Sequence, residues 1–161
     1  MNLIDSSQER PLPKTRVACF CDQVIQGSDG VMTIVRIIDR VELNLTQPLP
    51  PETANNSTSL SHSVTFFTLL DEVQDWFGHS FELWGRAPSA GFAKQGELLF
   101  SEAKFPMGSL SLTFRAELNL YYPGNYEFEV RVQNRSIVTR SLQLIVLPPD
   151  IGRSGPGQQR L

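Results

Sequence analysis

Residues 110–132 read LSLTFRAELNLYYPGNYEFEVRV and hold the clearest periodicity of the 161-residue chain. Between 110 and 120 every even-numbered residue is apolar, and the odd-numbered residues between them are polar or charged. The alternation resumes over 126–132, after a turn centred on Pro123 and Gly124. Because successive strand side chains point to opposite faces, this pattern predicts two antiparallel strands with one face buried and the other in water.

Six further segments have strand character. β-branched residues, which pack well on a pleated sheet and lose side-chain freedom in a helix, are frequent in 16–25 and 31–45. The turn residues QGSDG at 26–30 join these two segments as a hairpin. The remaining predicted strands are 63–71, 80–87, 96–105 and 142–146. About eight short strands without a convincing helix predict an all-β, antiparallel β-sandwich, and a closed barrel is the alternative that strand number does not separate from it.

The chain is long enough for one folded domain, and 40% of its residues are apolar, so a core can form without a disulfide or a metal. We expect this domain at 16–147, between a flexible arm at 1–15 and a flexible tail at 148–161. Residues 46–62 contain three prolines and a run of Asn, Ser and Thr. They predict a mobile loop, either a crossover between sheets or a functional lid.

Composition excludes several kinds of partner. The formal net charge is −3, which disfavours nucleic acid, because neutralising phosphates requires clustered Lys and Arg. The sequence has no run of 18 apolar residues for a membrane span, and its first residues have no secretory pattern. Cys19 and Cys21 lie within one apolar run, where we expect both thiols to be reduced. These features predict a cytoplasmic protein that binds neither nucleic acid nor membrane.

Chemical motifs are scarce. The spacing of Cys19, Cys21, His62 and His79 does not fit a zinc site, so we predict no metal and no other cofactor. The sequence has no G-x-S-x-G motif, which would mark a serine nucleophile. The candidate nucleophile is the thiol of Cys21, which His79 would activate. Calcium needs about six to eight oxygen ligands from converging loops. The carboxylates that such loops could supply are Asp71, Glu72 and Asp75 after one strand, and Asp22, Asp29 and Asp39 near the first hairpin.

One loop carries the candidate partner-binding residues Trp76, Phe77 and His79. Two adjacent large aromatic side chains, placed where strand periodicity lapses, are typical of an interface anchor. The alternative is that the loop folds over the end of the sandwich and Trp76 closes the core, as buried tryptophans often do.

Two stretches carry resemblances to known families. The turn Pro123-Gly124-Asn125-Tyr126 resembles the entry to a late strand of immunoglobulin-like domains, which implies that Tyr126 hydrogen-bonds back across the corner. The opening ACFCD at 18–22, followed by Gly30 and TIVRIIDRV at 33–41, resembles an uncharacterised family of small bacterial β-sandwich proteins. That resemblance implies a β-sandwich and a bacterial origin; the family has no assigned activity, so it implies nothing about function.

We therefore expect a non-enzymatic binding or structural module that acts through contacts with a protein partner. The alternatives are a calcium- or ligand-dependent sandwich domain, or a hydrolase without a recognisable motif.

Overall fold

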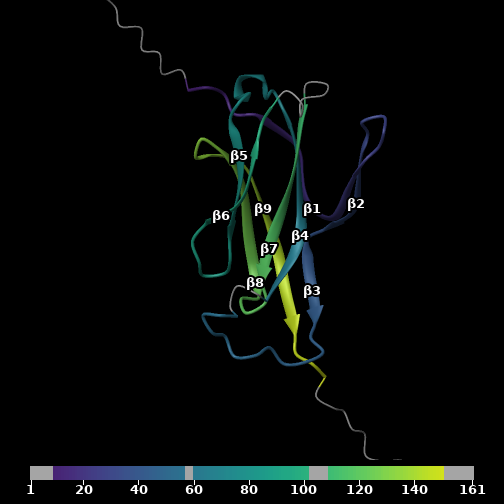
Figure 1. Ribbon diagram of the computed structural model, residues 1–161, viewed down its shortest axis with the longest axis vertical. Helices are drawn as coiled ribbons and strands as arrows, with labels where there is room; N and C mark the ends of the chain where they lie inside the picture. Colours follow the sequence, from purple (N-terminus) through teal and green to yellow (C-terminus); the bar gives the residue numbers. More distant parts are fainter. Residues whose placement is uncertain (1–8, 57–59, 102–108, 151–161) are drawn as a thin grey trace, which may run out of the picture.

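Two β-sheets packed face to face make up the computed structural model, which describes residues 9–56, 60–101 and 109–150 (Figure 1). The first sheet has the strand order β2-β1-β4-β7, and the second has the order β3-β9-β8-β5-β6. The predicted all-β, immunoglobulin-like sandwich is confirmed. Within the described ranges the elements are β1 (Lys14–Gln26), β2 (Met32–Ile38), β3 (Arg40–Asn44), β4 (Ser61–Asp71), the 3-10 helix η1 (Gln74–Trp76), β5 (Ser80–Arg86), β6 (Ala93–Leu99), β7 (Ser109–Asn119), β8 (Gly124–Val132) and β9 (Arg135–Leu147).

The core lies between the sheets and is built by the alternation seen in the sequence. The even-numbered residues of β7 are buried, and those of β8 face them from the other sheet. The rings of Phe20, Phe66 and Phe128 meet edge to face at the centre, where Phe20 lies 4.9 Å from Phe66 and 5.3 Å from Phe128 between ring centroids. Such geometry adds to the stabilisation that comes from burial alone.

Tyr126 forms the corner that its resemblance to immunoglobulin-like domains implies. Its hydroxyl accepts the backbone N–H of Asn119 at 3.1 Å and lies 2.9 Å from the carbonyl oxygen of Tyr122. Tyr126 is 2% exposed, so these bonds fix the end of β7 against the start of β8 inside the fold.

The segment 31–45 was predicted as one strand, and this prediction is wrong. The chain bends at Asp39, so that β2 pairs with β1 in the first sheet while β3 pairs with β9 in the second. The cause is visible in the apolar pattern: Ile38 and Val41 both pack on the core although they are three residues apart. A continuous strand would place them on opposite faces.

β3 and β9 are parallel, in contrast to the antiparallel pairing expected throughout. The bend at Asp39 moves the chain to the second sheet without reversing it, so β3 keeps the direction of β2, and Figure 1 shows its arrow pointing the same way as that of β9. The segment after β3 then leads to β4 in the first sheet, so it is a crossover between sheets. The hydroxyl of Tyr121 donates to the carbonyl oxygen of Pro50 at 2.7 Å and ties this crossover to the β7–β8 corner.

The ends of the predicted elements differ in detail. β1 begins at Lys14, inside the predicted arm, and the arm residues Arg10 and Pro11 contact the sandwich. β6 begins earlier and ends earlier than the predicted strand 96–105. Several predicted stretches lie partly outside the described residues: the arm at 1–8, the loop at 57–59, the strand at 102–105 and the tail at 151–161.

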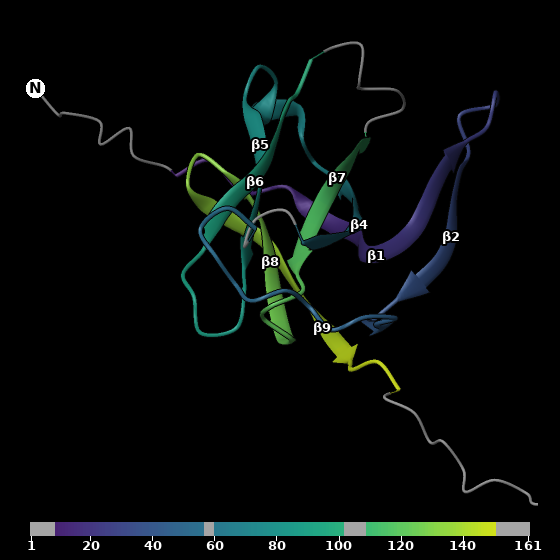
Figure 2. The same cartoon turned by 60° about the horizontal axis from the view of Figure 1, so that its bottom comes forward.

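β1 belongs to two pairings along its length. Its first half pairs with β4 as far as Cys21, and from Phe20 onward it pairs with β2. The second half of β1 and β2 form a two-stranded ribbon that stands away from the sandwich (Figures 1 and 2). Within the described ranges, no helix is long and apolar enough to cross a membrane.

We expect Tyr126→Phe to lower the free energy of unfolding by about 1–3 kcal/mol, because it removes the buried hydroxyl that holds the corner. Urea unfolding measures this change. The matched control is Tyr122→Phe, whose exposed hydroxyl bonds Glu52 and whose loss should change stability by about 0.5 kcal/mol or less. Equal effects of the two substitutions would contradict the role of the corner.

Candidate functional site

The loop predicted to bind a partner closes one end of the sandwich. Trp76 is 1% exposed, and its indole N–H donates to the carbonyl oxygen of Pro11 at 3.0 Å. The guanidinium groups of Arg10 and Arg135 lie 5.0 and 5.9 Å from the centroid of the indole ring. Trp76 therefore seals the core, as the alternative interpretation of the loop states, and it offers no surface to a partner.

Phe77 and His79 remain at the surface of this end. Phe77 is 50% exposed and its ring contacts Phe100 edge to face. The two ring nitrogens of His79 lie 2.9 Å from Arg10 and 3.2 Å from Gln133, so the imidazole holds the chain end to the β8–β9 turn. The structure thus brings the three predicted residues together but gives the tryptophan and the histidine structural contacts.

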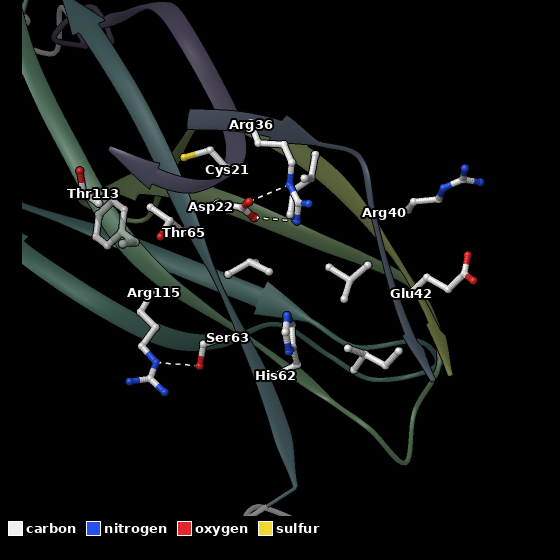
Figure 3. Close-up of a pocket in the computed structure, with 15 residues that line it drawn as sticks. Cys21, Asp22, Arg36, Arg40, Glu42, His62, Ser63, Thr65, Thr113 and Arg115 are labelled. Carbon is white, nitrogen blue, oxygen red and sulfur yellow. Dashed lines mark hydrogen bonds and ion pairs between the residues drawn. The ribbon is translucent and has the colours of Figure 1, made fainter. Parts of the chain in front are cut away.

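A larger open site lies on the side of the sandwich, between β3 and β4 (Figure 3). It is a cavity of about 810 Å³. The cavity exists because β1 leaves β4 after the pair Cys21↔Thr65, so no strand lies beside the segment from Ser61 to Val64 on that side. Sequence analysis did not find this site, since the departure of β1 depends on the long-range pairing of β2 and β3.

The β4 wall of the cavity carries backbone groups that have no strand partner among the described residues. The carbonyl oxygen of Leu60 accepts the N–H of Leu120 at 2.9 Å, so the polar groups of Leu60 point toward β7. Backbone groups alternate between the two edges along a strand. The N–H and C=O of Ser61 and Ser63 therefore point away from β7 and into the side where β1 is absent.

The β3 wall shows the same feature. The carbonyl oxygen of Asp39 accepts the N–H of Gln143, and the N–H of Leu45 donates to the carbonyl oxygen of Leu147. The odd-numbered residues of β3 thus use their backbone groups toward β9. Alternation leaves the N–H and C=O of Arg40 and Glu42 directed away from β9, toward the cavity.

The floor between the walls is apolar. Val41 and Val64, each 8% exposed, and Phe114, 5% exposed, are the core residues nearest the opening, and all three line the cavity. His62 is half-buried, and its ring lies between β3 and β4 in Figure 3. The cavity therefore combines an apolar floor with two polar backbone edges.

Ion pairs fix the charged groups on two sides of the opening. Arg36 lies 2.7 Å from the carboxylate of Asp22, and this contact holds a residue of β2 whose φ of 47° is in the left-handed region. Arg115 donates to Ser63 at 2.8 Å and pairs with Glu117. Burial raises the pKa of Glu117, but hydrogen bonds from serines and Arg115 outweigh it and hold that pKa below its usual range.

The two cysteines are free and lie on the outer face of the first sheet. Cys21 is fully buried in the wall of the cavity, and desolvation, with smaller contributions from Cys19 and Asp22, raises the pKa of its thiol to about 11. Its thiol is therefore protonated at neutral pH, which is the opposite of an activated nucleophile. His79 lies at the Trp76 end and not beside Cys21, so the structure does not form the Cys21–His79 pair.

Three of the six candidate calcium ligands, Asp22, Asp71 and Glu72, form ion pairs with cationic side chains. Asp71 pairs with Arg16 at 2.9 Å, and Glu72 pairs with Lys14 at 2.7 Å. Within the ranges 9–56, 60–101 and 109–150, no group of three or more His, Cys, Asp or Glu residues could hold a metal ion.

One surface feature was missed although three of its residues, Trp84, Arg86 and Arg131, lie on the outer face of β5 and β8. The guanidinium of Arg131 lies 4.6 Å from the centroid of the Trp84 ring and 5.1 Å from that of Phe92, in the β5–β6 connection. The guanidinium of Arg86 lies 4.8 Å from the centroid of the same Phe92 ring. The alternation of Trp84 and Arg86 along one strand face could have indicated this cation–π stack.

The two sheets and the corner tyrosine define an immunoglobulin-like β-sandwich with an open side. The chain is similar to an immunoglobulin-like protein from Pseudomonas aeruginosa of known crystal structure, with a TM-score of 0.42 and 11% identity over 84% of this chain and 98% of that one. No protein-family model matches the chain. No curated protein matches it either.

We expect Trp76→Ala to lower the free energy of unfolding by about 3–5 kcal/mol, because it empties the closed end of the core. Phe77→Ala should lower it by only about 1–2 kcal/mol, since Phe77 is already 50% exposed and loses mainly its contact with Phe100. Chemical denaturation of both variants checks this order. A stable Trp76→Ala protein would contradict the sealing role.

We expect stability to fall in alkali through Cys21. Its folded pKa of about 11 exceeds the ordinary value of 9.0, so above pH 9 the unfolded chain releases the proton first. Linkage then lowers the free energy of unfolding by up to about 1.4 kcal/mol per pH unit until the folded thiol titrates. Urea unfolding of the wild type and Cys21→Ala from pH 8 to 11 measures the difference. Parallel curves for the two proteins would contradict the shift.

Proposed function

We propose that this protein is a non-enzymatic binding module that takes up an extended segment of a partner protein in the cavity between β3 and β4. The observation that carries the proposal is the pair of unpaired strand edges, with Ser61 and Ser63 on one and Arg40 and Glu42 on the other, around one cavity. Strand addition to an open sheet edge is a common way to recognise a peptide.

The chemistry of the cavity favours a polypeptide over other ligands. A main chain offers donors and acceptors at strand spacing, which both walls can use at once. The apolar floor at Val41, Val64 and Phe114 then receives alternate side chains of the bound segment. A purely apolar ligand would leave the backbone groups of both walls without partners, which is costly once water is excluded.

The free cysteines and the kinked edge of β2 support a module that works as a monomer in a reducing compartment such as the cytoplasm. Both cysteines are free, as is usual for proteins of a reducing compartment, although Cys19 is partly exposed. β2, one of the two edge strands of the first sheet, is kinked at Arg36, and kinks of this kind discourage edge-to-edge association.

The test uses a substitution that blocks one wall without breaking the sheet. Ser63→Pro removes an N–H that faces the cavity and leaves the ladder to β7 intact, because proline is tolerated where a strand N–H faces solvent. Ser63→Ala is the matched control, since it removes the same hydroxyl contacts to Arg115 and Glu117 but keeps the N–H.

The probe is a displayed library of random heptapeptides selected on the immobilised protein. We expect a selected peptide to bind the wild type and Ser63→Ala alike and to bind Ser63→Pro about tenfold or more weakly. Glu42→Pro, on the β3 wall, provides the same test should Ser63→Pro not fold. The proposal is overturned when no peptide is selected, or when selected peptides bind the proline variants as well as the wild type.

A further inference from the structure

The β3 wall carries two charged side chains that have no partner within the described residues. Arg40 and Glu42 are exposed, and neither makes an ion pair or hydrogen bond there. They are two residues apart in a strand, so both project from the same face of β3, and Figure 3 shows both pointing away from the cavity floor. They stand beside the backbone groups that a bound segment would use.

The other charged groups that line the cavity among the described residues are already paired. Asp22 and Arg36 bind each other, and Arg115 binds Glu117. Arg40 and Glu42 therefore present one positive and one negative charge in a fixed order along β3, and a bound segment can place opposite charges against them. Opposite charges directly across two strands are favourable, and like charges there are unfavourable.

Pairing geometry sets which residues of the segment face which wall. In an antiparallel pair the residues opposite Arg40 and Glu42 exchange hydrogen bonds with them, while the residue opposite Val41 belongs to the closer, non-bonded pair. The side chain of that middle residue lies on the same face as Val41, toward the apolar floor. The N–H and C=O of the middle residue point to the opposite wall, toward the backbone groups of Ser61 and Ser63 that have no strand partner among the described residues.

Building on the proposed function, we infer that the partner segment lies antiparallel to β3 and carries, in order, a basic residue, an apolar residue and an acidic residue. The basic residue lies opposite Glu42, the apolar residue contacts Val41 and Val64, and the acidic residue lies opposite Arg40. Because β3 ends at the β7–β8 corner where β4 begins, a segment antiparallel to β3 runs parallel to β4. We assign the antiparallel ladder, which is the more stable one per residue, to β3 because that wall also carries the two unpaired charges.

Two synthetic peptides of identical composition test the order of charges: acetyl-TTKVETT-amide and acetyl-TTEVKTT-amide. Fluorescence anisotropy at low ionic strength compares their binding to the wild type and to the double variant R40E/E42R. We expect the wild type to bind the K-V-E peptide roughly fivefold more tightly than the E-V-K peptide, and the double variant to reverse this preference. A third peptide, with Asn in place of the central Val, should bind the wild type several-fold more weakly than the K-V-E peptide.

The outcomes separate this inference from the proposed function. Equal binding of the two charge orders, with both weakened by Ser63→Pro, overturns the charge assignment and leaves the binding cavity in place. A preference for E-V-K that the double variant reverses overturns the antiparallel orientation. Failure of all three peptides, while library-selected peptides still bind through Ser63, overturns the inferred sequence alone; failure of both sets overturns the inference and the proposed function together.

Discussion

The divided pairing of β1 determines the shape of the molecule. One strand has only two edges, and β1 gives one edge to β4 over its first half and the other to β2 over its second. Once the chain turns away at Cys21 to form the ribbon with β2, the start of β4 keeps its pairing with β7 but has no strand on its other edge within the described residues. Because β2 then continues into β3 across the sandwich, the second sheet receives its own edge strand at the same place. The open edges of β3 and β4, and the cavity between them, therefore follow from the point at which β1 leaves β4.

Buried contacts at both ends and at the centre hold the two sheets together, although one side of the sandwich is open. The corner hydroxyl of Tyr126 fixes one end and the buried indole of Trp76 seals the other, while the aromatic cluster around Phe128 holds the sheets together. Burial of these aromatic groups contributes to the stability of the sandwich. The segment from Ser61 to Val64 can therefore do without a second neighbour, because its other edge pairs continuously with β7.

Period-two patterns predicted the fold because they report a local fact, the burial of one strand face. They were reliable for β7 and β8, whose whole length faces the core. They failed at Asp39. The core-facing residues change there from an even number, Ile38, to an odd number, Val41, but this change lies within a long apolar run that was interpreted as one strand. The cavity could not be predicted in this way, since it arises from which strands are neighbours and not from the content of any strand. Trp76 shows a related limit: its adjacency to Phe77 left both exposure and burial open, and the contacts that bury it come from Arg10 and Arg135, far away in sequence.

An open strand edge favours association with any strand, so a protein that keeps one must restrict what pairs with it. The ribbon edge of β2 meets this requirement with the left-handed residue Arg36, which the carboxylate of Asp22 holds in place. The edge of β3 has no such kink and presents Arg40 and Glu42 instead. Against an identical copy aligned antiparallel about the central Val41, the two charges would face their opposites. The other edge of that copy's β3 is occupied by its own β9, so it would leave Ser61 and Ser63 without partners. A single segment has two free edges and can pair with both walls, which is why the β3 edge is better suited to a peptide than to a second copy of the domain.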